Sequence, residues 1–441
     1  MVLENKALAS FLKTFSYCRL NKLAVSCGFI ERKRRLRAVD LVRICAFWSG
    51  KTSYPTLTEI LGELRKSRVI LTRQSLDARF NPKAAAFLKK LAMELLRVKA
   101  NGKMDMDWAA GFGRILLLDS TIETLFDKCR KKYRGFGGGA SRSAVKVQHC
   151  FDLLSGNILT LLPQSGRKTD AAFGLRGIRR GDLFLFDLAY ANYRNLLRVI
   201  GKEAFFLCRL KFNSNVYVLK KGKYERIDLL RLISRMKEGD CMDVGVFLGA
   251  RQKVPVRMIL HKIPEGIARS NARKLKSDKQ QKRKGITKQR LAFCRANAYI
   301  TNLDAEKLPP DSARRVYSLR WQVEIVFKCW KSGFSLKQVP DIKIERFECF
   351  FYGCLIRIIV TTRFFWMIKT RVWNKARIEI SEIKAYKLMR NRIEQLKMAL
   401  IERQISLIRF TREIWYLFTQ SAVKSRKKGR QLPTQIMNMP G

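Results

Sequence analysis

The sequence predicts an α/β protein in which helical N-terminal and C-terminal regions flank a strand-rich middle. Residues 114–187 contain near-continuous apolar runs, which are typical of strands buried on both faces of a sheet. Residues 204–262 alternate between apolar and polar side chains, which favours hairpins of a separate antiparallel piece. Residues 1–100 and 340–420 have sequence patterns typical of helices. The sequence therefore indicates several layers built around a sheet.

The individual elements follow from local signals. A helix is expected to begin at Asn81-Pro82, because Asn caps a helix and Pro suits its first turn, and to end before Asn101-Gly102. In the middle region we expect strands at 114–119, 145–154, 157–164 and 182–187, a short helix at 170–178, and a later strand at 296–303. The basic run 269–290 is expected to be a mobile loop in the free protein.

The charge of the chain is its most unusual property. Its 90 Lys and Arg residues against 36 Asp and Glu residues leave a net charge of +54. A compact protein with this self-repulsion needs a polyanionic partner, and nucleic acid is the first candidate, ahead of a membrane surface. We therefore expect a DNA-binding protein.

The cysteines and histidines exclude several kinds of chemistry. Eleven cysteines occur without a Cys-x-x-Cys pair, and there are only two histidines. These counts exclude a zinc site of the usual sequence spacing and argue against Ser-His or Cys-His nucleophiles. The thiols are those expected of a reduced, cytosolic protein, and the start of the chain lacks the pattern of a secretory signal.

One stretch has the hydrophobicity of a membrane span. Residues 350–370 are strongly apolar, but they include Arg357 and Arg363. A bilayer would penalise both charges, so we expect a buried helix and no membrane partner.

Two aspartates occupy informative places. Asp119 and Asp187 each follow an apolar run, and ligands bind at the carboxyl ends of strands in open α/β sheets. The alternative is that each aspartate caps the next helix.

A third carboxylate lies in the stretch YSLRWQVEIVFKCWK at 317–331. On one helix, Tyr317, Arg320, Glu324 and Lys331 would fall at about 0°, 300°, 340° and 320°, opposite an apolar face. A solvated surface is the plain alternative. If Asp119, Asp187 and Glu324 converge, they would be metal ligands and catalytic residues. Two Mg²⁺ ions, with Mn²⁺ as a substitute, would then support phosphodiester displacement. Arg320 and Lys331 would hold DNA phosphates, and Tyr317 would contact a phosphate or sugar. Trp321 would stack on a base, with a place in the core as the equal alternative.

The spacing Tyr-x2-Arg-x3-Glu-x6-Lys resembles the YREK signature of insertion-sequence transposases in the large family numbered four. Further matches are DST at 119–121, AVKVQHCFDLLSG at 144–156, DLAY at 187–190, YITNL at 299–303 and RWQVEIVFKCWKSG at 320–333. Ala189 departs from the glycine that the family often has there. The resemblance implies a ribonuclease-H-like catalytic core interrupted by a β-rich insertion.

Five regions follow from these signals and the resemblance. They are a helical DNA-binding region at 1–105, the first part of the core at 106–200, the β-rich insertion with its basic loop at 201–295, the second part of the core at 296–370, and a helical C-terminal region with a basic tail at 371–441.

The resemblance implies a bacterial DDE transposase that binds terminal inverted repeats, cleaves the element ends and joins the 3′ ends to target DNA. We expect a homodimer when the ends are synapsed, and a cytoplasmic, nucleoid-associated protein. Two alternatives are a metal-dependent nuclease without strand transfer and a binding-only relative. Some relatives pass through a hairpin and hold a flipped base against an aromatic ring of the insertion. No Trp lies between Asp187 and Trp321, and the candidate rings are Phe212, Tyr217, Tyr224 and Phe247, with a place in the core of the insertion as the favoured alternative for each.

Overall fold

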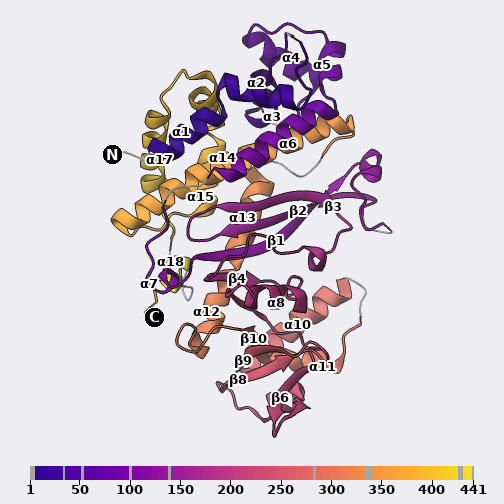
Figure 1. The fold of residues 1–441 in the computed structure, drawn as a ribbon, viewed down its shortest axis with the longest axis vertical. Helices are drawn as coiled ribbons and strands as arrows, with labels where there is room; N and C mark the ends of the chain where they lie inside the picture. Colours follow the sequence, from indigo (N-terminus) through magenta and orange to yellow (C-terminus); the bar gives the residue numbers. More distant parts are fainter. Residues whose placement is uncertain are drawn as a thin grey trace. The chain divides into compact units, whose positions relative to one another are not determined.

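The protein has a mixed α/β fold, as the sequence predicts (Figure 1). The structure is a computed structural model that describes residues 5–32, 35–50, 54–98, 102–137, 141–281, 285–333, 339–425 and 431–439. Its internal contacts define two compact units. Unit 1 comprises Met1–Asp105, Ser120–Lys168 and Gln322–Arg430, and unit 2 comprises Met106–Asp119, Thr169–Trp321 and Gln431–Gly441.

The N-terminal part of unit 1 is helical, as expected. Its helices are α1 (Asn5–Thr14), α2 (Tyr17–Ser26), α3 (Ala38–Ala46), α4 (Leu57–Lys66), α5 (Arg73–Arg79) and α6 (Pro82–Arg97). The Asn81 side chain accepts a hydrogen bond from the backbone N–H of Ala84 at 3.0 Å, and Pro82 is the first residue of α6. This end of α6 confirms the predicted cap, because Asn81 satisfies an N–H that has no partner within the helix.

The C-terminal part of unit 1 surrounds one long helix, α14 (Ile344–Ala376). Among the described residues, α14 alone is long and apolar enough to cross a membrane, but its most apolar window is entirely buried in the structure. Figure 1 shows α6 lying along α14, and α3 also packs on it. The prediction of a buried helix is therefore confirmed. The other elements here are α13 (Trp321–Gly333), α15 (Glu382–Arg390), α16 (Ile393–Lys397), η5 (Met398–Glu402) and α17 (Leu407–Ser421).

Close packing and backbone acceptors accommodate the unusual residues of α14. A Cβ atom on Gly353 would lie 2.2 Å from the carbonyl oxygen of Cys45, so glycine allows α14 to approach α3. Arg357 donates to the carbonyl of Ala46 at 2.7 Å, and Arg363 donates to the carbonyl of Leu96 at 3.2 Å. Burial lowers the pKa of Arg363 to about 10. Both arginines thus gain polar partners inside the helical core.

A buried ion cluster fixes the start of α15. Glu382 forms ion pairs with Lys369 and, at 3.2 Å, with Lys424. Burial raises the pKa of Glu382, but the two ammonium groups outweigh burial and lower the pKa to about 2. The carboxylate is therefore charged in the folded protein.

The strands of unit 1 are the second part of β1 (Arg114–Leu125), together with β2 (Ser143–Asp152) and β3 (Ile158–Ser165). β2 and β3 pair antiparallel, and every residue of β2 is buried. The 3₁₀ helix η1 (Asp127–Lys131) follows β1. β1 continues past Asp119, where the sequence predicted its end, because the β-branched residues Thr121 and Ile122 prolong the strand.

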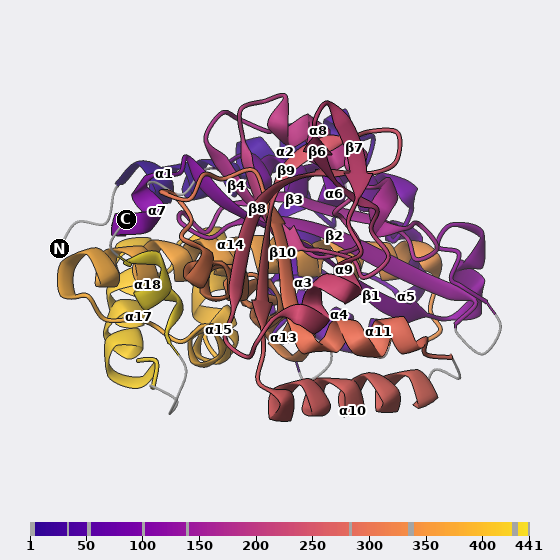
Figure 2. The ribbon, with the colours of Figure 1, turned by 90° about the horizontal axis from the view of Figure 1, so that it is seen from below.

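Unit 2 is built on a mixed sheet in the strand order β1-β4-β5-β10-β9-β8-β6-β7. β1, β4 and β5 run parallel, and the remaining neighbours pair antiparallel. Figure 2 shows β8, β9 and β10 side by side. The strands are β4 (Asp182–Phe186), β5 (Phe205–Arg209), β6 (Val216–Lys220), β7 (Lys223–Arg226), β8 (Cys241–Leu248), β9 (Val254–Lys262) and β10 (Ala296–Thr301). The expected strands at 182–187 and 296–303 are thus present, but β5 was wrongly assigned to the antiparallel piece, since it pairs parallel with β4.

Helices of unit 2 correct two further predictions. The expected helix at 170–178 is only the short η2 (Asp170–Ala172), because Gly174 and Gly177 disfavour a longer one. Of the basic run 269–290, expected as a loop, the described residues 269–281 and 288–290 are helical, because the run is rich in Lys, Arg and Gln, which favour helix. The helices are α7 (Asp107–Ala110), α8 (Tyr193–Ile200), α9 (Leu229–Arg235), α10 (Glu265–Gln281), α11 (Lys288–Ala292), η3 (Phe293–Arg295), η4 (Pro310–Ser312), α12 (Ala313–Ser318) and α18 (Pro433–Met437).

Candidate catalytic site

The two aspartates lie on or next to two neighbouring parallel strands of unit 2: Asp119 is on β1, and Asp187 directly follows β4. The β1–β4 ladder ends with Leu117 paired to Leu185. Continuing that register by two residues brings Asp119 opposite Asp187. Neighbouring strands lie about 4.8 Å apart, so both carboxylates start from adjacent points of the sheet. The alternative of helix capping is not found, because β1 continues beyond Asp119, and Asn192 caps α8, the next α-helix after Asp187.

Arg320 lies beside the first aspartate. Its Nη1 atom is 3.7 Å from Oδ2 of Asp119, and the side chains are 10% and 21% exposed. The guanidinium carbon also lies 6.0 Å from the ring centroid of Tyr317 and 5.8 Å from that of Trp321. A largely buried cation is thus held between a carboxylate and two aromatic rings, which keeps its direction fixed.

Tyr317 fastens α12 to the end of β4. Its hydroxyl donates a hydrogen bond to the carbonyl of Phe186, the residue before Asp187, at 3.0 Å. Burial raises the pKa of Tyr317 above its ordinary value, so the phenol keeps its proton. Because that proton is already donated to a carbonyl, a hydrogen bond from Tyr317 to a phosphate would require this contact to open. The expected DNA contact of Tyr317 stays a prediction.

Trp321 follows directly and is open to a ligand. Its side chain is among the exposed large apolar groups, at 53% exposure. The alternative that Trp321 packs in the core is therefore wrong. An exposed indole next to an arginine suits base stacking, and the expected contact of Trp321 with a base stays a prediction.

The single helix expected at 317–331 is divided. α12 ends at Ser318 and α13 begins at Trp321. Between them the N–H groups of Leu319 and Arg320 bond to carbonyls three residues back, which makes a tight turn. Tyr317 and Arg320 therefore do not share one regular helical stripe with Glu324, and the orientation of Arg320 is set by the turn.

Unit 1 contains Glu324 and Lys331, both on α13. They are seven residues apart, which is two helical turns, so they lie on the same side of α13. Glu324 is half-buried. The opposite side packs inward as predicted, and its buried residues are Val323, Val326, Phe327 and Trp330.

α13 packs on a neutral histidine of β2. The ring centroid of Trp330 lies 4.6 Å from that of His149. Burial lowers the pKa of His149 to about 3, so the imidazole is uncharged near neutral pH. This histidine belongs to the core.

Lys331 has a partner that the sequence analysis missed. Its Nζ atom is 2.8 Å from Oε1 of Glu123, and the two side chains are 31% and 10% exposed. Glu123 is on β1, four residues after Asp119, and alternate residues of a strand share a face. Asp119 and Glu123 are an even number of residues apart, which is the spacing that puts strand residues on one face. Recognising this signal required knowing that β1 continues beyond Asp119.

Comparisons with known proteins show which family the chain belongs to. Residues 110–359 match the family described as the transposase DDE domain. The transposase for insertion sequence element IS231E of Bacillus thuringiensis subsp. finitimus is 30% identical to this chain, over 95% of the chain and 92% of that relative. The transposase for IS1151 of Clostridium perfringens is 27% identical, over 98% of this chain and 95% of that relative.

The mixed sheet and the matched domain define a DNA-transposing enzyme of the DDE class. The chain belongs to the DDE transposase family, and its relatives are transposases of insertion sequences. This confirms the resemblance to insertion-sequence transposases. The family implies a divalent metal ion and DNA as the partner. Asp119 and Asp187 fit such an ion, because they offer only oxygen donors from neighbouring strands.

Proposed function

We propose that this protein binds the terminal inverted repeats of its own insertion sequence, cleaves the DNA at the element ends, and joins the 3′ ends to target DNA. The observation that carries the proposal is that Asp119 lies on β1 and Asp187 directly follows the parallel neighbouring strand β4, with Arg320 against Asp119. Such a pair of carboxylates beside a fixed cation suits a reaction at a phosphodiester. Membership of the family numbered four stays a prediction.

In this proposal Asp119, Asp187 and Glu324 hold Mg²⁺, with Mn²⁺ as a substitute. Two bound ions would activate the attacking oxygen and stabilise the leaving oxygen of an in-line displacement. The protein's own contribution is to fix the carboxylates. In the proposal β1 and the end of β4 would hold Asp119 and Asp187, and the packing of the buried face of α13 would set the direction of Glu324.

Arg320 and Lys331 would hold phosphates of the strand being cut. Both are held by carboxylates in the absence of DNA, at 3.7 Å and 2.8 Å. A DNA phosphate would therefore have to displace these carboxylates before it could bind Arg320 or Lys331. Trp321 would stack on a base beside Arg320, since its ring is exposed.

Two other basic surfaces support contacts with the DNA backbone. In unit 1, a concave surface is lined by Arg32, Arg35 and Arg79 together with the hydroxyls of Thr72 and Ser75. This surface suits recognition of the element ends by the N-terminal region. In unit 2, Arg269, Arg273 and Lys276 are exposed at helical spacing along α10. Lysine and arginine contacts of this kind give affinity without sequence information.

An aromatic group in unit 2 suits a flipped base. Tyr224 packs edge-on against Phe247 at 5.1 Å between ring centroids and is 45% exposed. The ammonium of Lys253 lies 3.0 Å from the ring centroid of Tyr217 and 4.7 Å from that of Tyr224. Stacking gives about 1–3 kcal/mol per base, which offsets the cost of flipping, so a hairpin route is part of the proposal. Phe212, the fourth candidate, lies under Arg290.

The proposal includes a homodimer when the two element ends are synapsed, and action at the nucleoid. The alternatives remain a nuclease that cuts without joining and a binding-only relative. Purified protein, Mg²⁺ and DNA with the flanking inverted repeats distinguish all three. We expect element ends joined to target DNA. Cut ends without joined products would support the nuclease, and bound but intact DNA would support the binding-only protein.

A further inference from the structure

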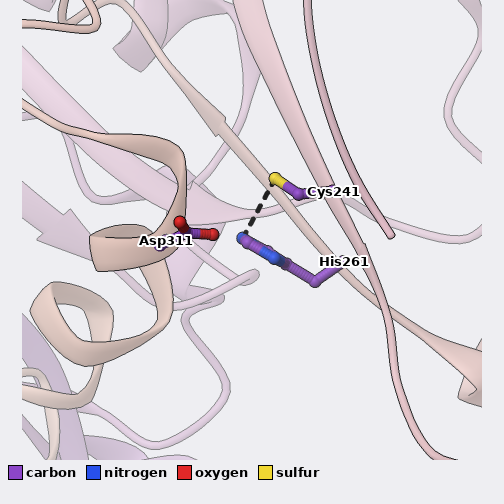
Figure 3. A group of neighbouring side chains, drawn as sticks. All are labelled: Cys241, His261 and Asp311. Atoms are coloured by element: carbon purple, nitrogen blue, oxygen red, sulfur yellow. Dashed lines mark hydrogen bonds between the residues drawn. The ribbon is translucent and has the colours of Figure 1, made fainter. Parts of the chain in front are cut away.

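A second group of metal-binding side chains converges in unit 2. Cys241 begins β8, His261 lies near the end of β9, and Asp311 lies in η4. Cys241 and His261 are direct partners in the antiparallel ladder, so their side chains stand on the same face of the sheet. Figure 3 shows the Asp311 carboxylate and the Cys241 sulfur on either side of the tip of the His261 ring. Three different kinds of ligand thus point to one place.

The distances are close to those around a tetrahedral metal. The candidate ligand atoms of the three residues lie within 4.8 Å of one another, and Sγ of Cys241 is 3.8 Å from Nε2 of His261. Zinc bonds of about 2.3 Å to sulfur and about 2.0 Å to nitrogen place such atoms about 3.5 Å apart. The Cys241 and His261 atoms would need to move by only a few tenths of an ångström, and the Asp311 carboxylate by up to about an ångström.

A backbone carbonyl completes the group. Nε2 of His261 lies 3.0 Å from the carbonyl oxygen of Pro310. Two lone pairs repel at this distance, so without a metal Nε2 must carry a proton and donate it to Pro310. A metal in place of that proton would satisfy both atoms, because neighbouring nitrogen and oxygen ligands are about 3.3 Å apart.

We propose that Cys241, His261 and Asp311 bind one structural Zn²⁺, with the carbonyl oxygen of Pro310 as the fourth ligand. A donor set of sulfur, nitrogen and oxygen selects zinc or cobalt over magnesium. On binding, the thiol of Cys241 releases a proton to solvent, and the imidazole proton of His261 moves from Nε2 to Nδ1, so that neutral His261 binds the metal through Nε2. Sequence spacing did not reveal this site, because strand pairing brings together residues that are far apart in the chain.

The zinc would fasten β8 and β9 to the segment that leads into α12. Arg257 of β9 already donates to the carbonyls of Asp304 and Leu308, both at 2.9 Å. The metal would add a second connection between the β8–β9 pair and this segment, at Pro310 and Asp311 directly before α12. Since α12 contains Tyr317 and leads into the turn with Arg320, the metal would steady the segment that positions Arg320. The binding of zinc itself would require neither Mg²⁺ nor DNA.

Cobalt titration of the purified, chelator-treated full-length chain tests the proposal without DNA. We expect one equivalent of Co²⁺ to produce a sulfur-to-cobalt charge-transfer band, and excess Mg²⁺ to leave it unchanged. Cys241→Ser should abolish the band, and Asp311→Asn should weaken Co²⁺ binding by at least about tenfold. Cys18→Ser is the matched control, because Cys18 is also exposed but lies on α2 of unit 1. The control should keep the band.

Thermal unfolding gives a second readout. Zn²⁺ should raise the Tm of the wild type and of Cys18→Ser, and it should leave that of Cys241→Ser unchanged, since a ligand stabilises only a fold that binds it. A wild-type chain without a charge-transfer band at one equivalent of Co²⁺ would overturn the proposal. A band that persists in Cys241→Ser would also overturn it, because the sulfur would then come from another cysteine.

Discussion

The ion pair between Lys331 and Glu123 gives a prediction that links stability to DNA binding. If Lys331 holds a phosphate, DNA must compete with Glu123 for it. Exposed ion pairs contribute about 0.2–1 kcal/mol, and breaking a buried pair costs about 3–5 kcal/mol. With side chains 31% and 10% exposed, this pair falls between those limits, at about 1–2 kcal/mol. Glu123→Gln should therefore strengthen DNA binding by up to about tenfold at low salt, since 1.4 kcal/mol is a factor of ten.

The assay is DNA binding measured at several salt concentrations, together with denaturant unfolding. Lys331→Ala should reduce the salt slope by about 0.9, the value for one phosphate contact. It should also lower the free energy of unfolding by about 1–2 kcal/mol, more than Glu123→Gln does, because it leaves a nearly buried carboxylate unpaired. The double variant should recover part of that stability. Unchanged affinity in Glu123→Gln with an unchanged slope in Lys331→Ala would refute the reasoning and leave Lys331 a purely structural residue.

Three further predictions concern the turn, the helical core and acid stability. Arg320→Ala should impair joining of element ends in a gel assay, and normal joining would mean that Arg320 does not hold a phosphate. Gly353→Ala should lower the free energy of unfolding by about 1–3 kcal/mol, because its Cβ would lie 2.2 Å from the carbonyl oxygen of Cys45. Gly62→Ala, in open space on α4, should not destabilise, and equal effects of the two would contradict the packing argument. The lowered pKa of Glu382 means that its contribution to stability is present above about pH 4.5 and is lost as pH falls toward about 2. Glu382→Gln should flatten that part of the acid-unfolding curve.

Local patterns were sufficient for much of the fold. The cap at Asn81 and the buried character of α14 could be predicted, because each depends on neighbouring residues alone. Pairing partners could not be predicted in the same way. β5 has an alternating sequence but pairs parallel with β4, and this is a property of the whole sheet. No local sequence signal predicts the division of the helix at Leu319 and Arg320, since neither residue disfavours helix.

The same limit applies to the site. Asp119 and Asp187 could be singled out because each follows an apolar run, but their common register is visible only in the strand ladder. Glu123 was missed because the predicted strand stopped at Asp119, which hid the shared face. The cluster of Cys241, His261 and Asp311 was missed because antiparallel pairing creates it.

The most direct test of the central claim is cleavage of inverted-repeat DNA by alanine variants of the three carboxylates. Asp119→Ala, Asp187→Ala and Glu324→Ala should each abolish cleavage with Mg²⁺ or Mn²⁺, because each removes a metal ligand. Binding to the same DNA should stay nearly unchanged, since affinity comes mainly from phosphate contacts. Near-normal cleavage by any one of these variants would contradict the assignment and remove that residue from the catalytic site.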